Sequence, residues 1–447
     1  MTVELLIGRP ASGKTEACIH EIYKIQSSQP LANIWILVPD SQNIAYFRRR
    51  LADAGGGIGV NVTTFSTLYT KILHPHQIFT PAISPALEHR LVQETIDAAY
   101  DAGFITHYAA IKNKPGFILA LQDIFSELRS GYISPLQFSE YTQDKSIAKQ
   151  ELALLYDHFL ERLQDLNWID RDGQIWQAID VLRADPDAAS DIRFVVVDGF
   201  SAFAGARVQF LKLLSRQVGE ILITLPGQLD SNRPVHRKSQ SEIIHLIQEL
   251  SPNINQINTN PHLFSECQHL EKFVLEPGEC EKKKARSAIF LEAPSPAQEA
   301  REALRWIKTL NKRRGLSLDK CAIFAANLQT YRPLLQLAAN EFGIKVRFSH
   351  PESLMEAPAI QTIINLLELP LNDFPSRGLI NSLRSPYFDF GLKTNEINAL
   401  EWLSQHANIV MGRDQWDETW EMLLQTTATE DKFFDDEEQF KNLLAEI

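Results

Sequence analysis

Cysteine is scarce in this chain of 447 residues, and long apolar runs are absent. The four cysteines, Cys18, Cys267, Cys280 and Cys321, are scattered, and no two of them form a Cys-x-x-Cys pair. This spacing is typical of buried reduced thiols and gives no support to a zinc site, an iron–sulfur cluster or a disulfide framework. No run approaches the roughly 18 apolar residues that a membrane-spanning helix needs.

Basic residues are in the minority. Lysine and arginine number 44 against 56 acidic residues, which gives a net charge of −12. This balance weighs against a protein that coats nucleic acid non-specifically, although it is compatible with a local basic track. The N-terminus shows no basic segment followed by an apolar one, so no signal peptide is expected. We therefore expect a cytoplasmic protein without a membrane partner.

The length suggests roughly three domains of about 150 residues each. In the first half, short apolar runs predict β-strands, and apolar residues at steps of three or four predict helices from about 84 to 188. This order predicts one α/β domain that carries a helical insertion. The predicted strands cover residues 3–7, 34–38, 59–64, 194–197 and 221–225.

The second half is patterned differently. Residues 226–287 are polar and rich in proline, asparagine and lysine, which predicts a loop and linker. Beyond them, alternating strand and helix patterns predict a second α/β unit, and the chain is helical and acidic from about residue 371. The predicted elements of the second unit are strands at 288–291, 321–325 and 345–348 and helices at 297–310 and 330–342.

The segment Gly8-Arg9-Pro10-Ala11-Ser12-Gly13-Lys14-Thr15 matches the phosphate-binding pattern Gly-x4-Gly-Lys-Thr. Glycine permits the backbone angles and the close approach that such a loop requires. Its N–H groups, together with the N-terminus of the following helix, would bind phosphate oxygens. Lys14 would reach the β- and γ-phosphates and Thr15 would ligate Mg²⁺, while Gly8, Ala11, Ser12 and Gly13 form the cradle. The alternatives are a coincidental turn and a relic loop that no longer binds.

A second nucleotide element follows the predicted strand at 194–197. Asp198 ends that strand, and in P-loop proteins an aspartate in this position holds Mg²⁺. The alternative is a carboxylate that merely caps a strand end. Many motor ATPases carry a glutamate directly after this aspartate, and here Gly199 takes that place, so the sequence predicts nucleotide binding without fast hydrolysis.

Several segments resemble one family, the AddB (RexB) subunit of bacterial ATP-dependent helicase–nucleases, itself similar to the UvrD-like superfamily 1 helicases. No nuclease constellation is identifiable, and an AddB subunit is normally far longer, so the chain resembles an N-terminal portion of that subunit or a shortened relative. The segments that carry the resemblance, besides the phosphate loop, are Val38–Gln42, Val62–Leu68, Pro115–Phe117 with Glu127-Leu128, Val197–Phe200 with Phe203, Glu299–Ile307, Asn327–Arg332 and Gly343–Phe348.

The resemblance also implies residues that contact DNA. Gln42, Thr64, Phe65 and Ser66 correspond to helicase segments near single-stranded DNA, where hydroxyls suit phosphate oxygens and an aromatic ring can stack a base. Arg332 corresponds to an arginine near the nucleotide phosphates. Each has a structural alternative: Gln42 as a helix cap, Phe65 as a core residue and Arg332 as a surface cation.

The sequence thus predicts an α/β P-loop NTPase fold with two RecA-like parallel-sheet domains, a helical insertion and a partial C-terminal helical region. The resemblance implies a helicase-like subunit that binds ATP, Mg²⁺ and single-stranded DNA beside a motor–nuclease (AddA-like) partner in double-strand-break repair. Two alternatives stay open, a scaffold with a vestigial nucleotide site and a P-loop phosphotransferase. The expected boundaries are 1–80 and 191–285 for the first domain, 81–190 for the insertion, 286–370 for the second domain, which is incomplete, and 371–447 for the helical region.

Overall fold

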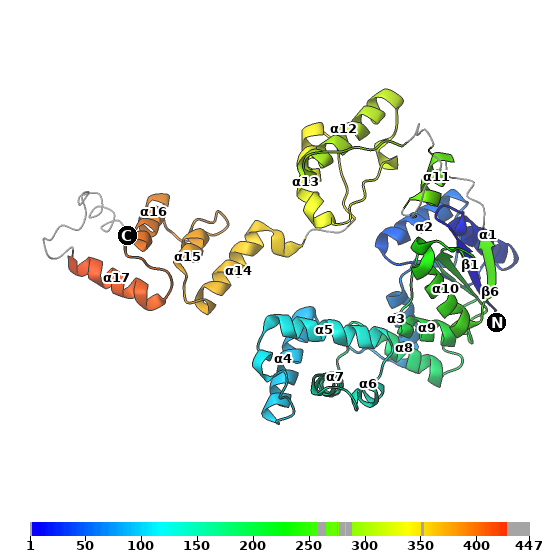
Figure 1. Cartoon of the computed structure of the whole chain (residues 1–447), viewed down its shortest axis with the longest axis horizontal. Helices are drawn as coiled ribbons and strands as arrows, with labels where there is room; N and C mark the ends of the chain where they lie inside the picture. The colour runs from blue at the N-terminus through cyan, green and yellow to red at the C-terminus, as the bar shows by residue number, and fades with distance from the viewer. Residues whose placement is uncertain are drawn as a thin grey trace. The chain divides into compact units, whose positions relative to one another are not determined.

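Figure 1 shows the computed structural model of the chain, which describes residues 2–257, 265–274, 276, 282, 288–349 and 353–426. The chain divides into two compact units, Met1–Leu291 and Glu292–Ile447. Among the described residues, no helix combines the length and the apolarity needed to cross a membrane.

The first unit is built on a six-stranded, all-parallel sheet with the order β3-β2-β4-β5-β1-β6. Strands β2 and β4 are apolar along their whole length and β1 and β5 along most of it, because a parallel sheet is covered on both faces. Since the strands are parallel, all of their carboxyl ends meet at one edge, where α/β proteins bind ligands. The strands are β1 Thr2–Gly8, β2 Ile34–Leu37, β3 Val60–Thr63, β4 Phe194–Val197, β5 Glu220–Pro226 and β6 Asn253–Ile257.

Helices cover both faces of this sheet, as Figure 1 shows. On one face, α1 (Lys14–Ser28) and α2 (Ser41–Asp53) share a core with the sheet, and Ile22 and Phe47 are buried there. The other face is covered by helices that bury Phe65, Ile179 and Phe210 against it. Those helices are α3 Phe65–Leu73, α8 Gly173–Ala184, α9 Gly205–Leu214 and α10 Arg237–Leu250.

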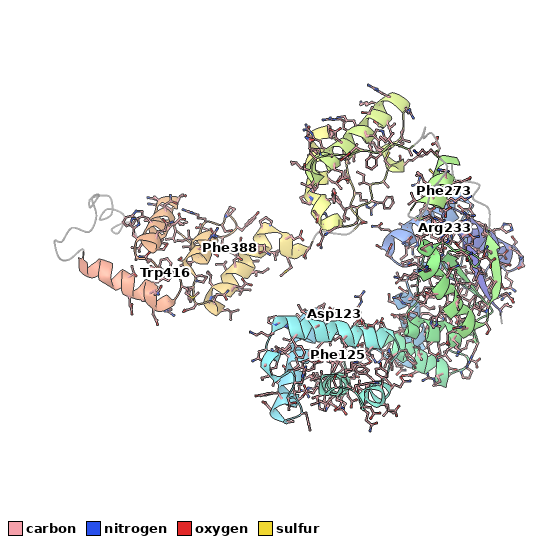
Figure 2. The ribbon with its side chains drawn as sticks, viewed as in Figure 1. Asp123, Phe125, Arg233, Phe273, Phe388 and Trp416 are labelled. Carbon is pink, nitrogen blue, oxygen red and sulfur yellow. The ribbon has the colours of Figure 1, made fainter. Side chains whose placement is uncertain are left out.

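The helical insertion lies between β3 and β4 in the chain and has a core of its own. Phe125 packs inside it against Phe159, with ring centroids 5.1 Å apart, whereas Asp123 on the same helix faces solvent (Figure 2). Pro85, Pro115 and Pro135 each begin a helix, where proline is favoured because the first N–H groups lack intrahelical partners. The helices predicted here are confirmed as α4 Pro85–Asp101, α5 Pro115–Ser130, α6 Pro135–Thr142 and α7 Ile147–Asp165, followed by α8.

The prediction of a loop and linker over residues 226–287 is wrong for much of its described part. Helix α10 buries only Ile243 and Leu246, so its apolar stripe is narrow in the sequence. Among the described strands, β6 pairs with β1 alone at the edge of the sheet, and its sequence, Asn-Ile-Asn-Gln-Ile, lacks an apolar run. Helix α11 (Ser265–Phe273) follows, while 258–264, 275, 277–281 and 283–287 lie outside the described residues.

The second unit begins with a helix pair, α12 (Pro296–Arg314) and α13 (Leu328–Phe342), as predicted. The three strands predicted at 288–291, 321–325 and 345–348 are wrong, because the structure assigns no strand to them. A strand needs a hydrogen-bonded neighbour. The apolar residues of 345–348 instead pack against the helix pair, and those of 288–291 and 321–325 include two largely exposed side chains, Phe290 and Phe324. A second RecA-like parallel sheet is therefore not found in the described part of this unit.

Four helices complete the described chain. They confirm the helical prediction for the residues after 371 as far as 426, and 427–447 lie outside the described residues. Trp416 (Figure 2) donates its indole N–H to the Phe374 carbonyl at 3.3 Å, which links the last helix to the loop after α14. The helices are α14 Pro358–Leu371, α15 Ser376–Leu383, α16 Thr394–His406 and α17 Arg413–Thr426.

Candidate nucleotide site

The glycine-rich loop joins the carboxyl end of β1 to the first turn of α1. Gly13 has a φ of 89°, in the left-handed region that favours glycine, and a side chain at Gly8 would collide with the Ser12 side chain. The Ser12 hydroxyl is buried and has no hydrogen-bond partner within the described part of the chain. Because buried polar groups are normally hydrogen-bonded, this donor fits a loop that receives an anion.

Lys14 folds back over its own loop. Its Nζ donates to the Gly8 carbonyl at 2.8 Å and to the Arg9 carbonyl at 2.9 Å. These two oxygens stand in for the phosphate oxygens that the ammonium would bind. Burial lowers the pKa of Lys14, and the nearby Asp198 carboxylate opposes that shift. An arriving polyphosphate would act in the same direction as Asp198 and favour the charged lysine.

The side chains of Thr15 and Asp198 meet at the mouth of this loop. The Thr15 hydroxyl donates to Asp198 Oδ2 at 3.0 Å, and the Thr224 hydroxyl donates to Asp198 Oδ1 at 2.5 Å. The register of β4 against β5 places Thr224 beside Asp198, which is 8% exposed. The two residues predicted to hold Mg²⁺ are therefore in hydrogen-bond contact, although they are far apart in the sequence.

This donor set fits magnesium. Mg²⁺ prefers oxygen ligands and is usually held by one or two carboxylates together with waters and substrate phosphates. Among the described residues, no three or more histidine, cysteine, aspartate or glutamate side chains lie together in a way that could hold a metal ion. These residues therefore form no metal site built from several carboxylates. Thr15 and Asp198 match the sparser arrangement of a nucleotide-bound ion.

A cavity of about 250 Å³ opens beside these groups. Asp198 is the only carboxylate among the described residues that line it, and three of these residues lie on helix α2. Its lining residues are Lys14, Thr15, Val38, Asn43, Tyr46, Phe47, Asp198, Gly199, Phe200, Ser201, Thr224 and Pro226. The sequence interpretation missed Thr224, although a polar residue inside the apolar run at 221–225 is a usable signal. It also missed Asn43 and Ser201, for which no pattern stands out.

The loop is also tied to a later segment by ion pairs. Arg9 pairs with Glu271 on α11 at 3.2 Å, and Glu271 pairs with Arg233 at 3.1 Å. Arg233 in turn pairs with Glu276 at 2.8 Å. Figure 2 labels Arg233 and, on α11, Phe273. The polar segment after β5 therefore reaches back to the loop, a connection that sequence patterns do not reveal.

The predicted DNA contacts fall at the same edge of the sheet. Gln42 lies in the exposed first turn of α2, after β2, and its backbone N–H is capped by Asp40. The hydroxyls of Thr64 and Ser66, after β3, share a hydrogen bond of 2.9 Å at the start of α3. Phe65 is buried, and its ring meets the Phe200 ring edge-on at 5.4 Å. The structure therefore favours the core alternative for Phe65 over base stacking.

Arg332 lies in the second unit, on α13, with its guanidinium 4.6 Å from the centre of the Phe348 ring. Its neighbour Tyr331 donates its hydroxyl to Glu299 on α12 at 2.6 Å. The predicted place of Arg332 near the phosphates stays a prediction.

Comparison with known proteins identifies the family. The family described as "ADDB, N-terminal" matches residues 5–284. Two relatives, from Bacillus pumilus and Symbiobacterium thermophilum, are each named as the B subunit of an ATP-dependent helicase/deoxyribonuclease. They are 22% and 23% identical to this chain over 94% and 96% of its length, and the chain spans only 38% and 39% of theirs. Because the family matches more than half of the chain, the protein belongs to the AddB N-terminal family.

Proposed function

We propose that the first unit binds ATP and Mg²⁺ at the loop of residues 8–15 and at Asp198. The observation that carries this proposal is the 3.0 Å hydrogen bond between the Thr15 hydroxyl and the Asp198 carboxylate, at the mouth of the loop. Lys14 would contact the β- and γ-phosphates, and Mg²⁺ bound by Thr15 and Asp198 would neutralise phosphate charge. Thr224 holds the carboxylate in the orientation that this requires.

We further propose that the chain acts as a helicase-like subunit of a double-strand-break repair helicase–nuclease and is itself a weak motor. The relatives are named as one subunit of an enzyme, which supports a complex with a partner, and we expect that partner to be an AddA-like motor–nuclease subunit. Single-stranded DNA would cross the edge of the sheet at Gln42, Thr64 and Ser66. A role on bacterial DNA also implies a cytoplasmic protein. Weak hydrolysis is proposed because, among the described residues that line the cavity, Asp198 is the only acid.

The binding proposal is tested with labelled ATP and Mg²⁺ on wild type, Lys14→Ala and Lys24→Ala. Lys24 is a matched control because it lies on the same helix but is exposed and pairs with Glu21. We expect Lys14→Ala to abolish binding and Lys24→Ala to leave it unchanged. Absence of binding by the wild type would refute the proposal.

The specific alternative is a scaffold with a vestigial nucleotide site, which the two carbonyl contacts of Lys14 favour because they close the loop on itself. ATP turnover with and without single-stranded DNA separates the two. DNA-stimulated turnover that Lys14→Ala removes supports a weak motor, whereas binding without turnover supports the scaffold. Robust ATP-driven strand displacement by this chain alone would contradict both.

DNA binding is tested separately by titrating fluorescent single-stranded DNA at several salt concentrations. Contacts to phosphates predict an affinity that falls as salt rises, because binding releases counterions. Thr64→Val with Ser66→Ala should weaken binding, and Ser41→Ala, also exposed but outside the predicted contact set, should not. Equal affinity of both variants would remove this edge as the DNA site.

A further inference from the structure

The glycine after Asp198 is required by the backbone. Gly199 has a φ of 85°, where other residues are strained, and a Cβ built on it would lie 3.2 Å from Cδ of Pro39. The residue type and the neighbouring loop therefore both oppose a side chain here. A glutamate at position 199, where many motor ATPases carry one, would therefore be strained.

Asn43 lies next to the place that such a side chain would occupy. Its Nδ2 donates to Asp40 Oδ2 at 3.0 Å, and a carboxylate can only accept, so the amide orientation is fixed. Its Oδ1 then lies 3.9 Å from the position of a Cβ on Gly199. Asn43 also lines the cavity together with Lys14 and Asp198.

We propose that Asn43 is a water-positioning residue for slow ATP hydrolysis, an inference that rests on the proposed binding of ATP and Mg²⁺. Its Oδ1 accepts a hydrogen bond from the water that attacks the γ-phosphorus. The bond between that phosphorus and the β–γ bridging oxygen breaks, and ADP and phosphate leave. An amide cannot take the proton of the water, which passes to a phosphate oxygen or to solvent, so the step is oriented but not base-catalysed.

The pair formed by Asp40 and Asn43 offers an unusually well-matched test. The double variant Asp40→Asn/Asn43→Asp keeps the net charge and keeps the hydrogen bond with its direction reversed. Asparagine caps a helix about as well as aspartate, so α2 should still form. The exchange presents a carboxylate oxygen to the cavity where the wild type presents an amide oxygen.

We expect the exchanged pair to raise kcat for ATP hydrolysis on the order of tenfold or more, since a positioned base typically contributes about 10²–10⁴-fold. Asn43→Ala should lower kcat several-fold. Both variants should keep the Kd for ATP and Mg²⁺ within about threefold of wild type. If Asn43 were merely structural, its substitution would change the Kd and kcat together. Ser41→Ala, exposed in the same helical turn, should leave kcat and Kd unchanged.

The Kd measurements keep this inference separate from the proposed function. A wild-type chain that does not bind ATP and Mg²⁺ refutes the proposed function. Variants that bind normally and melt at the wild-type temperature, but turn over ATP no faster in the exchanged pair and no slower in Asn43→Ala, would overturn the role of Asn43.

Discussion

Thr224→Val removes one hydroxyl from the centre of the candidate site and keeps the shape of the side chain. That hydroxyl donates to Asp198 Oδ1 at 2.5 Å, and Thr224 is buried in β5. A hydrogen bond to a charged group contributes ~1.5–3 kcal/mol, and a buried acceptor left without a donor loses that amount. We therefore expect the free energy of unfolding to fall by about 2 kcal/mol, or the melting temperature by roughly 4–8 °C for a unit of this size.

The same substitution should weaken Mg²⁺-dependent ATP binding. With Oδ1 unpaired, the Asp198 carboxylate is free to rotate away from Thr15, and partners that orient a metal ligand typically contribute about 10–100-fold in affinity. The assays are urea denaturation followed by circular dichroism and nucleotide titration at several Mg²⁺ concentrations. Thr142→Val is the control, because that buried hydroxyl donates to carbonyls of its own helix and not to a charge.

Two results would refute this reasoning. One is a Thr224→Val protein that is as stable as the wild type and binds ATP with unchanged Mg²⁺ dependence. The other is an equal loss of stability in Thr142→Val, which would show that the carboxylate has no special need for its donor.

Three further predictions concern stability, each measured by urea denaturation. Gly199→Ala should lower the free energy of unfolding by about 1–2 kcal/mol, because alanine is strained at positive φ. Asp170→Asn breaks the buried pair with Arg129 and should cost about 3–5 kcal/mol, while Asp180→Asn at an exposed pair should cost under about 1 kcal/mol. Burial would raise the pKa of Glu151, but three backbone N–H groups in the loop after α4 hold it below its usual value. That contribution is fully present above about pH 4.3 and is lost as pH falls through the lowered pKa, so Glu151→Gln should cost about 1–3 kcal/mol at pH 7 and progressively less as the pH is lowered below about 4.

The sequence predicted the sheet of the first unit well because its inner strands are largely buried. Strands β2 and β4 are continuous apolar runs, β1 and β5 are apolar except at positions such as Glu4 and Thr224, and the glycine-rich loop and Asp198 follow β1 and β4 directly. Parallel pairing then brings the predicted Thr15 and Asp198 together without any further signal. Strand β6 was missed because an edge strand with one neighbour tolerates asparagine and glutamine.

The second unit could not be predicted in the same way. A short apolar run can form a β-strand, or it can form an extended segment that packs against helices. Periodicity does not distinguish these two structures. Val346 and Phe348 pack against α12 and α13, which accounts for their apolar character without a sheet. The side of the cavity formed by α2 was hidden for a different reason. Asn43 owes its orientation to a hydrogen bond with Asp40, and such local contacts leave no periodic pattern.

The elements that would hold a nucleotide differ from those that would break it. The groups that would bind the nucleotide lie at the carboxyl ends of three neighbouring strands, whose register fixes them in the middle of the sheet. The loop and Thr15 follow β1, Asp198 follows β4, and Thr224 lies in β5. The position of the missing acid instead lies where Gly199 meets Pro39, between the ends of β4 and β2. There the backbone is left-handed, and the polar group fixed beside it is the neutral amide of Asn43. If both proposals hold, binding would depend on the sheet and turnover on one turn of α2, so substitutions in that turn should change turnover and leave binding intact.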